Sequence, residues 1–199
     1  MITTTRAAPW REQAPLPYGV AARSEMACVA RTFALLAKRR LHLPSEHVGM
    51  LLRFANGTTA RVFRETVVER GATEDPCVLL VEFQLRLVRG LGHALFRTES
   101  ILNTPLFAGF PGLVSKLWLA NDEHGSYRGL YEWDGPSPAV HYARCLWRVL
   151  ALVCVPDSIH YVVLPGLRRG ELLNAPRQLD VVAPEDAAAW WRVVELPPS

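Results

Sequence analysis

Apolar and polar residues alternate along one segment of the chain, 78–88, which reads VLLVEFQLRLV. Its apolar side carries Leu79, Val81, Phe83, Leu85 and Leu87, and its polar side carries Glu82, Gln84 and Arg86. A period of two predicts a β-strand with one apolar face. That face needs a covering layer elsewhere in the chain.

The patterns after this strand predict a helix, a hairpin, a second helix and a last strand. These elements span 92–104, 112–135, 137–154 and 158–166. Pro105 ends the first helix, and Ser137-Pro138 begins the second. The order β, α, β, β, α, β predicts an α+β protein with a ferredoxin-like unit, in which both helices cover one face of an antiparallel sheet.

A helix and a hairpin are predicted ahead of this unit. Apolar residues at helical spacing predict a helix over 24–40, with Ser24 as its N-cap. The residues expected to face the core are Met26, Val29, Ala30, Phe33, Leu36 and Ala37. Asn56-Gly57 lies between two strand-like runs, which predicts a β-hairpin.

These boundaries divide the chain into four predicted parts. A flexible arm covers 1–20, and the N-terminal helix and β-hairpin form an extension over 21–75. The ferredoxin-like domain covers 76–167, and a tail with a short helix covers 168–199. Trp190 and Trp191 are expected to hold that tail against the body.

The hairpin within 112–135 has two distinct predicted faces. With the turn at 121–125, Trp118 opposes Arg128 and Lys116 opposes Leu130. One face then carries Val114, Lys116, Trp118, Arg128 and Glu132. The other carries Leu113, Ser115, Leu117, Leu119, Tyr127, Gly129, Tyr131 and Trp133, and we expect the helices to cover it.

The charged hairpin face also contains a large aromatic residue, Trp118. Trp118 opposite Arg128 predicts a cation–π pair, and Glu82 and Glu132 are candidates for a salt-bridged layer with the arginines. A large aromatic among charges is unusual on bare surface, which favours a homodimer formed through this face. The alternative is an open face in contact with water.

Composition and charge exclude several classes of function. The formal net charge is +3, and the basic residues are scattered and interleaved with acids, so we expect no nucleic-acid partner. The strongly apolar run VLALVCV is too short to cross a bilayer, so we expect no membrane partner. Four cysteines without metal-ligand spacing predict free thiols, no metal site and a cytoplasmic location. Phosphate-loop, HExxH and GxSxG motifs are missing as well.

Several stretches of the second unit are similar to one known family. The strand LLVEFQL, the run FAGFPGLVSKLWL, the strand GSYRGLYEWDG and the helix SPAVHYARCLWRVL resemble the YdhR-like monooxygenase-related proteins of the dimeric α+β barrel superfamily. The resemblance covers about 76–167 and implies two subunits packed sheet to sheet, with ligand cavities beside the sheets. The N-terminal 70 residues depart from that pattern.

The same resemblance implies a range of activities without selecting one. Relatives include cofactor-independent quinone-forming oxygenases, polyketide cyclases, haem-degrading enzymes and proteins with no known activity. A haem ligand of that branch would be a histidine late in the second helix, and 146–155 contains none. We therefore expect no cofactor.

Two small residues in the hairpin predict a pocket. Ser115 and Gly129 lie among large aromatic side chains, so the packing there should leave a gap for a flat, small aromatic ligand. The predicted ligand-binding residues are Ser115, Trp118, Gly129, Tyr131 and Trp133. The alternative is a filled aromatic core in which Gly129 serves strand geometry.

A cofactor-free oxygenase requires a base, a partner for the substrate anion and a dry cavity. His160 or His93 is the predicted base, and Tyr127 or Arg128 the predicted anion partner. Together with these residues, the resemblance implies a cofactor-independent monooxygenase acting on an aromatic or polyketide-type secondary metabolite. A polyketide cyclase and a non-catalytic dimeric ligand-binding protein are the alternatives.

Overall fold

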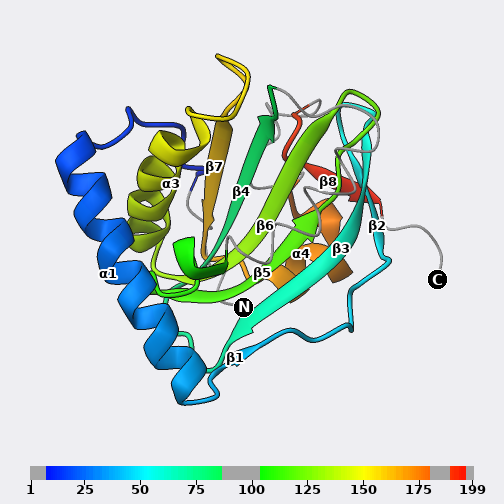
Figure 1. The fold of residues 1–199 in the computed structure, drawn as a ribbon. Helices are drawn as coiled ribbons and strands as arrows, with labels where there is room; N and C mark the ends of the chain where they lie inside the picture. Colours follow the sequence, from blue (N-terminus) through cyan, green and yellow to red (C-terminus); the bar gives the residue numbers. More distant parts are fainter. Residues whose placement is uncertain (1–7, 87–103, 180–188, 196–199) are drawn as a thin grey trace.

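The computed structural model describes residues 8–86, 104–179 and 189–195 (Figure 1). The strands are β1 Leu41–His42, β2 Leu51–Phe54, β3 Thr59–Val68, β4 Pro76–Gln84, β5 Leu113–Leu119, β6 Ser126–Asp134, β7 His160–Pro165 and β8 Val193–Glu195. The helices are α1 Tyr18–Ala37, α3 Pro136–Leu150, α4 Arg169–Asn174 and the 3₁₀ helix Pro176–Gln178. All strands join one antiparallel sheet in the order β7-β4-β6-β5-β3-β2-β8, with β1 beside β3.

Four adjacent strands of the sheet, β7, β4, β6 and β5, come from the predicted ferredoxin-like unit. β4 and β6 form the central pair, β7 lies beside β4, and β5 lies beside β6. The helix predicted over 92–104 lies outside the described residues, except for Thr104 at its end. The protein is therefore a mixed α+β protein with a curled antiparallel sheet, consistent with a ferredoxin-like fold.

The N-terminal hairpin is confirmed and extends the same sheet. β2 and β3 pair across Asn56-Gly57, where Gly57 has a φ of 87° that favours glycine. β3 pairs with β5, and β2 pairs with β8 near the end of the chain. The predicted extension is thus continuous with the sheet of the predicted ferredoxin-like domain.

The predicted register of the β5–β6 hairpin is wrong after its first pair. Leu113 opposes Trp133 as predicted, but an irregularity follows at Val114 and Ser115 pairs with Glu132. Lys116 therefore opposes Tyr131, and Trp118 opposes Gly129. A bulge of one residue turns every later side chain of β5 to the other face of the sheet.

The bulge changes which residues meet the helices. Trp118 joins the cluster that packs against α3 and α1, together with Leu79, Val81, Tyr131 and Trp133. We call this side of the sheet the helix face. Leu117 and Leu119, predicted for that side, pack on the opposite side of the sheet, which we call the inner face.

The inner face is buried by the chain itself, so the prediction of a polar face is wrong. Its buried residues include Val78, Leu80, Leu117, Leu130, Val162 and Leu164. Residues of β2, β8 and α4 and the buried Trp191 cover them, and Trp191 thereby holds the tail as predicted. The chain's own residues thus cover the face through which the homodimer was predicted to form, and the homodimer itself stays a prediction.

α1 differs from its prediction in both its start and its buried side. It begins at Tyr18 with Pro17 as the N-cap, rather than at Ser24. Its buried residues are Ala21, Cys28 and Thr32. The apolar residues that were predicted to face the core, Met26 and Phe33 among them, point mostly into solvent.

Candidate functional site

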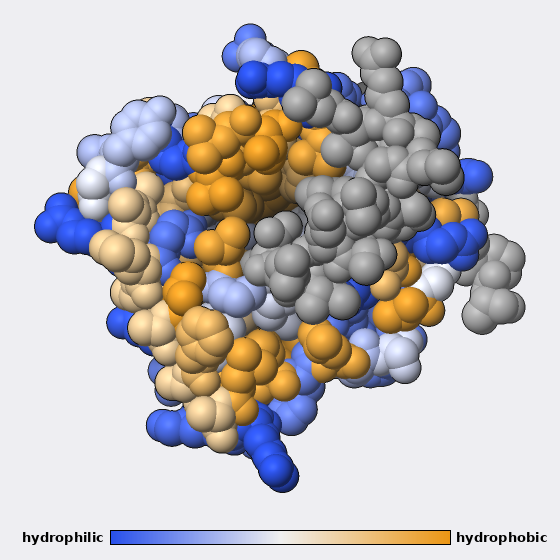
Figure 2. Space-filling view, in the orientation of Figure 1, coloured by the Kyte–Doolittle hydropathy of each residue, from blue (hydrophilic) through white to orange (hydrophobic). Residues whose placement is uncertain are grey.

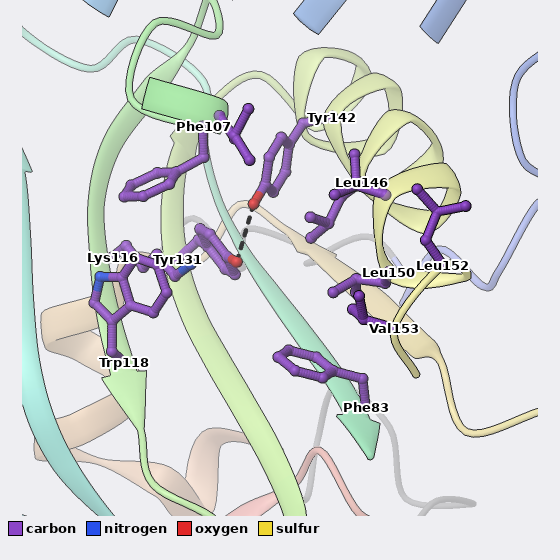
Figure 3. Close-up of a pocket in the computed structure, with 12 residues that line it drawn as sticks. Phe83, Phe107, Lys116, Trp118, Tyr131, Tyr142, Leu146, Leu150, Leu152 and Val153 are labelled. Carbon is purple, nitrogen blue, oxygen red and sulfur yellow. Dashed lines mark hydrogen bonds between the residues drawn. The ribbon is translucent and has the colours of Figure 1, made fainter. Parts of the chain in front are cut away.

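A cavity of about 260 Å³ lies between the helix face of the sheet and α3 (Figure 3). Its lining residues are Phe83, Leu106, Phe107, Lys116, Trp118, Tyr131, Tyr142, Leu146, Val149, Leu150, Leu152 and Val153. Leu152 and Val153 are exposed, which places them at the rim. Figure 2 shows a hollow bordered by hydrophobic residues on this side of the molecule.

Lys116 is the one charged side chain among these lining residues. It is only 5% exposed, and its Nζ lies 3.1 Å from the ring centroid of Trp118 and 4.3 Å from that of Phe107. Within the described part of the chain, no carboxylate forms an ion pair with it. Burial, and secondarily the charge of Arg64, holds the pKa of Lys116 well below its usual value. The cavity therefore contains an amine whose charged form is disfavoured by burial.

Trp118 forms the wall of the cavity beside Lys116. Its Nε1 donates a hydrogen bond of 3.1 Å to Thr66 Oγ1 on β3. The Arg64 guanidinium lies 3.9 Å from the indole centroid, and Phe107 meets the indole edge to face at 5.1 Å. The indole thus packs against two basic side chains, those of Arg64 and Lys116.

Two tyrosine hydroxyls meet inside the cavity. Tyr131 on β6 and Tyr142 on α3 lie 3.1 Å apart at their oxygens, as the dashed line in Figure 3 marks. Burial raises the pKa of both phenols, so both stay protonated. One hydroxyl donates to the other, which leaves a second O–H for a ligand.

Gly129 allows the Tyr131 ring to lie where it does. A Cβ at position 129 would lie 2.5 Å from Cε2 of Tyr131. The space predicted beside Gly129 is therefore filled by that ring, and the cavity lies further toward α3. Ser115, at the bulge, is buried with no hydrogen-bond partner for Oγ among the described residues.

The structure brings two of the predicted ligand-binding residues, Trp118 and Tyr131, into the cavity. Trp133 is buried behind it, with its ring 5.0 Å from that of Tyr142. Ser115 and Gly129 do not line the cavity.

The predicted base and anion partners do not share this cavity. Arg128 lies on the inner face, paired with Asp122 at 2.9 Å and with Glu82. His160 is part-exposed and pairs with Glu12 at 3.0 Å. Tyr127 stacks on Phe83 at 5.9 Å and does not line the cavity, and His93 lies outside the described residues. Catalytic roles for these four residues stay predictions.

Lys116 and Tyr142 are site residues that the sequence analysis missed, and the reason is clear for Lys116. The alternating pattern assigned it to the polar face, because the pattern carried no sign of the bulge at Val114. One signal was present: the chain contains only two lysines, and this one lies in a run of leucines and tryptophan.

The described residues offer neither a metal site nor a membrane-spanning helix. No group of three or more histidine, cysteine, aspartate or glutamate side chains is placed to hold a metal ion there. None of the described helices combines the length and apolarity needed to cross a bilayer. The four cysteines are all buried free thiols.

Comparison with known proteins adds little to this geometry. No protein-family model matches the chain, and no curated protein sequence matches it. A similar solved structure is an uncharacterized ferredoxin-fold protein related to antibiotic biosynthesis monooxygenases, from Listeria monocytogenes 4b F2365. It shares 13% identity, with 64% of this chain and 93% of that chain covered and a TM-score of 0.38. At that level the likeness carries no argument about activity.

Proposed function

We propose that the chain is a cofactor-independent oxygenase that acts on a flat, electron-rich aromatic compound, with Lys116 as the base. The observation that carries the proposal is the buried Lys116 amine, which lies among aromatic rings without a carboxylate partner in the described structure. A lysine with a lowered pKa is a suitable general base near neutral pH. The substrate must therefore carry an acidic C–H or O–H.

The walls of the cavity fit the same class of substrate. Phe83, Phe107 and Trp118 offer ring faces and edges to a flat molecule, and leucines of α3 close the other side. The volume of about 260 Å³ lies near the small end for ligand pockets. A compound of two or three fused rings, such as an anthrone or a naphthol, is the expected size.

The first step is proton transfer from the substrate to Nζ of Lys116. For a methylene activated by a ring carbonyl, this leaves a carbanion delocalised into the rings and an ammonium on Lys116. The ammonium and the spare tyrosine O–H stabilise that anion in an apolar cavity. The aliphatic side chains of α3 exclude water from it.

Molecular oxygen is the oxidant in the second step. The anion passes electrons to O₂, a C–O bond forms, and the resulting peroxide takes the proton back from Lys116. The hydroperoxide then loses water as its O–O bond breaks and the second C–H proton leaves. In sum, one CH₂ and one O₂ become one C=O and one H₂O, with Lys116 restored.

Oxygen uptake with anthrone and with naphthols tests this proposal. Wild-type protein is expected to consume O₂ and form the quinone, and Lys116→Met to be slower by about 10²–10⁴-fold. Lys38→Met is the matched control, because Lys38 is the other lysine of the chain and is exposed. Activity should rise with pH as Lys116 loses its proton, with its midpoint well below about 10.4. Equal activity in wild type and Lys116→Met would refute the assignment.

An aldol-type cyclase is a second candidate, favoured by the Tyr131–Tyr142 hydroxyl pair. A neutral phenol O–H can polarise a carbonyl while Lys116 removes a proton next to another. Such a reaction consumes no O₂. Turnover of a polyketide-type model diketone at the same rate with and without oxygen would favour the cyclase, and ligand binding without turnover would favour a non-catalytic binding protein.

A further inference from the structure

The solvent-facing side of α1 carries a row of large apolar side chains. Tyr18 is 69% exposed, Met26 66%, Phe33 61% and Leu36 47%. We call these four residues the α1 stripe, and smaller alanines lie between them. An exposed apolar row along a whole helix marks an interaction surface, since water disfavours it.

Every fully exposed charge on this helix and its C-terminal turn is basic. Arg23, Arg31, Lys38 and Arg39 are exposed, and Arg40 follows them. The one acid between 18 and 40 is Glu25, whose two carboxylate oxygens are shielded from water. The exposed charges beside the α1 stripe are therefore all positive.

The α1 stripe lies on the side of the molecule that also carries the cavity. α3 packs against α1 and lines the cavity, and the Arg148 guanidinium of α3 lies 4.2 Å from the Tyr18 ring. The exposed Leu152 and Val153 continue the apolar surface at the rim. Figure 2 shows hydrophobic residues both along α1 and around the hollow in one view.

We propose that α1 docks on the surface of an anionic membrane, with the α1 stripe inserted among the lipids and the basic residues against the headgroups. An apolar stripe with arginine and lysine beside it is the pattern of a helix that lies in the membrane interface. A two-fold contact between two copies of α1 is disfavoured, because it would bring two all-basic edges together. The sequence-based expectation of no membrane partner considered only a segment long enough to cross a bilayer, whereas a helix that lies on the membrane surface needs no such segment.

Vesicle flotation of the full-length protein tests the proposal. The protein should float with vesicles of phosphatidylcholine and phosphatidylglycerol in equal parts and not with phosphatidylcholine alone. Binding should weaken at high salt, as expected for attraction between exposed basic residues and anionic lipid. Flotation with neither vesicle would overturn the proposal.

Substitutions on α1 locate the contact. Met26→Glu with Phe33→Glu should weaken binding at least about tenfold by removing the inserted side chains. Arg31→Gln and Lys38→Gln should each weaken it about fivefold. Val194→Glu is the control, since Val194 is exposed on β8 at the far edge of the sheet (Figure 1), and it should leave binding unchanged.

Two further readouts separate this inference from the alternatives. Lys116→Met should float like wild type, because the membrane contact does not use the cavity. The membrane proposal therefore does not depend on the oxygenase proposal. A concentration-dependent dimer that Met26→Glu with Phe33→Glu abolishes, together with unchanged flotation, would overturn it and assign the α1 stripe to a second copy. Circular dichroism of each variant confirms that the fold is retained.

Discussion

Two cations are buried on opposite faces of the β5–β6 hairpin, and their surroundings differ. Arg128 on the inner face is flanked by the carboxylates of Asp122 and Glu82. Lys116 on the helix face is surrounded by the rings of Trp118, Phe107 and Tyr131. The charge of Arg128 is thus compensated by carboxylates, whereas the Lys116 amine has no carboxylate partner among the described residues.

The packing around Arg128 is also tighter than the packing around Lys116. The inner face is filled by aliphatic residues that are almost fully buried, together with Trp191 and Phe54, whose ring lies 4.4 Å from Arg128 Cζ. The helix face leaves the cavity between its aromatic residues and α3. The filled face and the face with the cavity therefore lie on opposite sides of one layer of strands.

Removing the compensated cation should have the largest effect on stability. Arg128→Met leaves Asp122 and Glu82 buried without a positive charge, so the free energy of unfolding should fall by about 3–5 kcal/mol. Urea denaturation measures it. Arg31→Met, at an exposed arginine, should change it by less than about 0.5 kcal/mol. A loss in Arg128→Met as small as in that control would remove the distinction between the two faces.

Adding one methyl group on the helix face should have an intermediate effect. Gly129→Ala places a Cβ against the Tyr131 ring, which must move into the cavity. The free energy of unfolding should fall by about 1–3 kcal/mol, and binding of naphthol, followed by fluorescence, should weaken. Gly19→Ala, where a Cβ meets no atom within 4 Å in α1, should leave both nearly unchanged. Unchanged binding in Gly129→Ala would exclude Tyr131 from the ligand site.

Removing the uncompensated cation should raise stability. Lys116→Met keeps the length of the side chain and removes the buried amine, so the free energy of unfolding at neutral pH should rise by about 1–2 kcal/mol. The pKa of Lys116 is lower in the folded protein than in the unfolded chain. Between these two pKa values, the unfolded chain therefore binds one proton more than the folded protein. Wild-type stability therefore rises with pH through that interval, and the gain in Lys116→Met shrinks. Destabilisation at every pH would show that Lys116 supports the fold.

The sequence predicted the positions of most strands along the chain but not β1 or β8, because alternation and turn residues are local signals. β4, the Asn56-Gly57 hairpin, α3 and the last strand of the unit follow from them. The bulge at Val114 carries no such signal, since nothing in GLVSKLW distinguishes it from regular strand. Because of that one residue, Lys116 and Trp118 lie on the opposite face from the one predicted. The contribution of Lys116 to the cavity was therefore not predicted.

The prediction for α1 failed for a different reason. Its apolar spacing correctly indicated an amphipathic helix, but spacing does not say whether the apolar side meets the protein or another surface. In the fold, Ala21, Cys28 and Thr32 make the close contacts because small residues let α1 approach its neighbours. The larger apolar residues of α1 therefore face solvent.

The protonation state of Lys116 tests the central claim most directly. Lysine labelled with ¹³C at Cε gives signals from only two residues, and Lys38→Arg assigns them. The account predicts that the Lys116 signal completes its titration well below the usual lysine value of about 10.4. A Lys116 signal that keeps the shift of an ammonium up to about pH 10 would contradict it, because that amine could not act as the base.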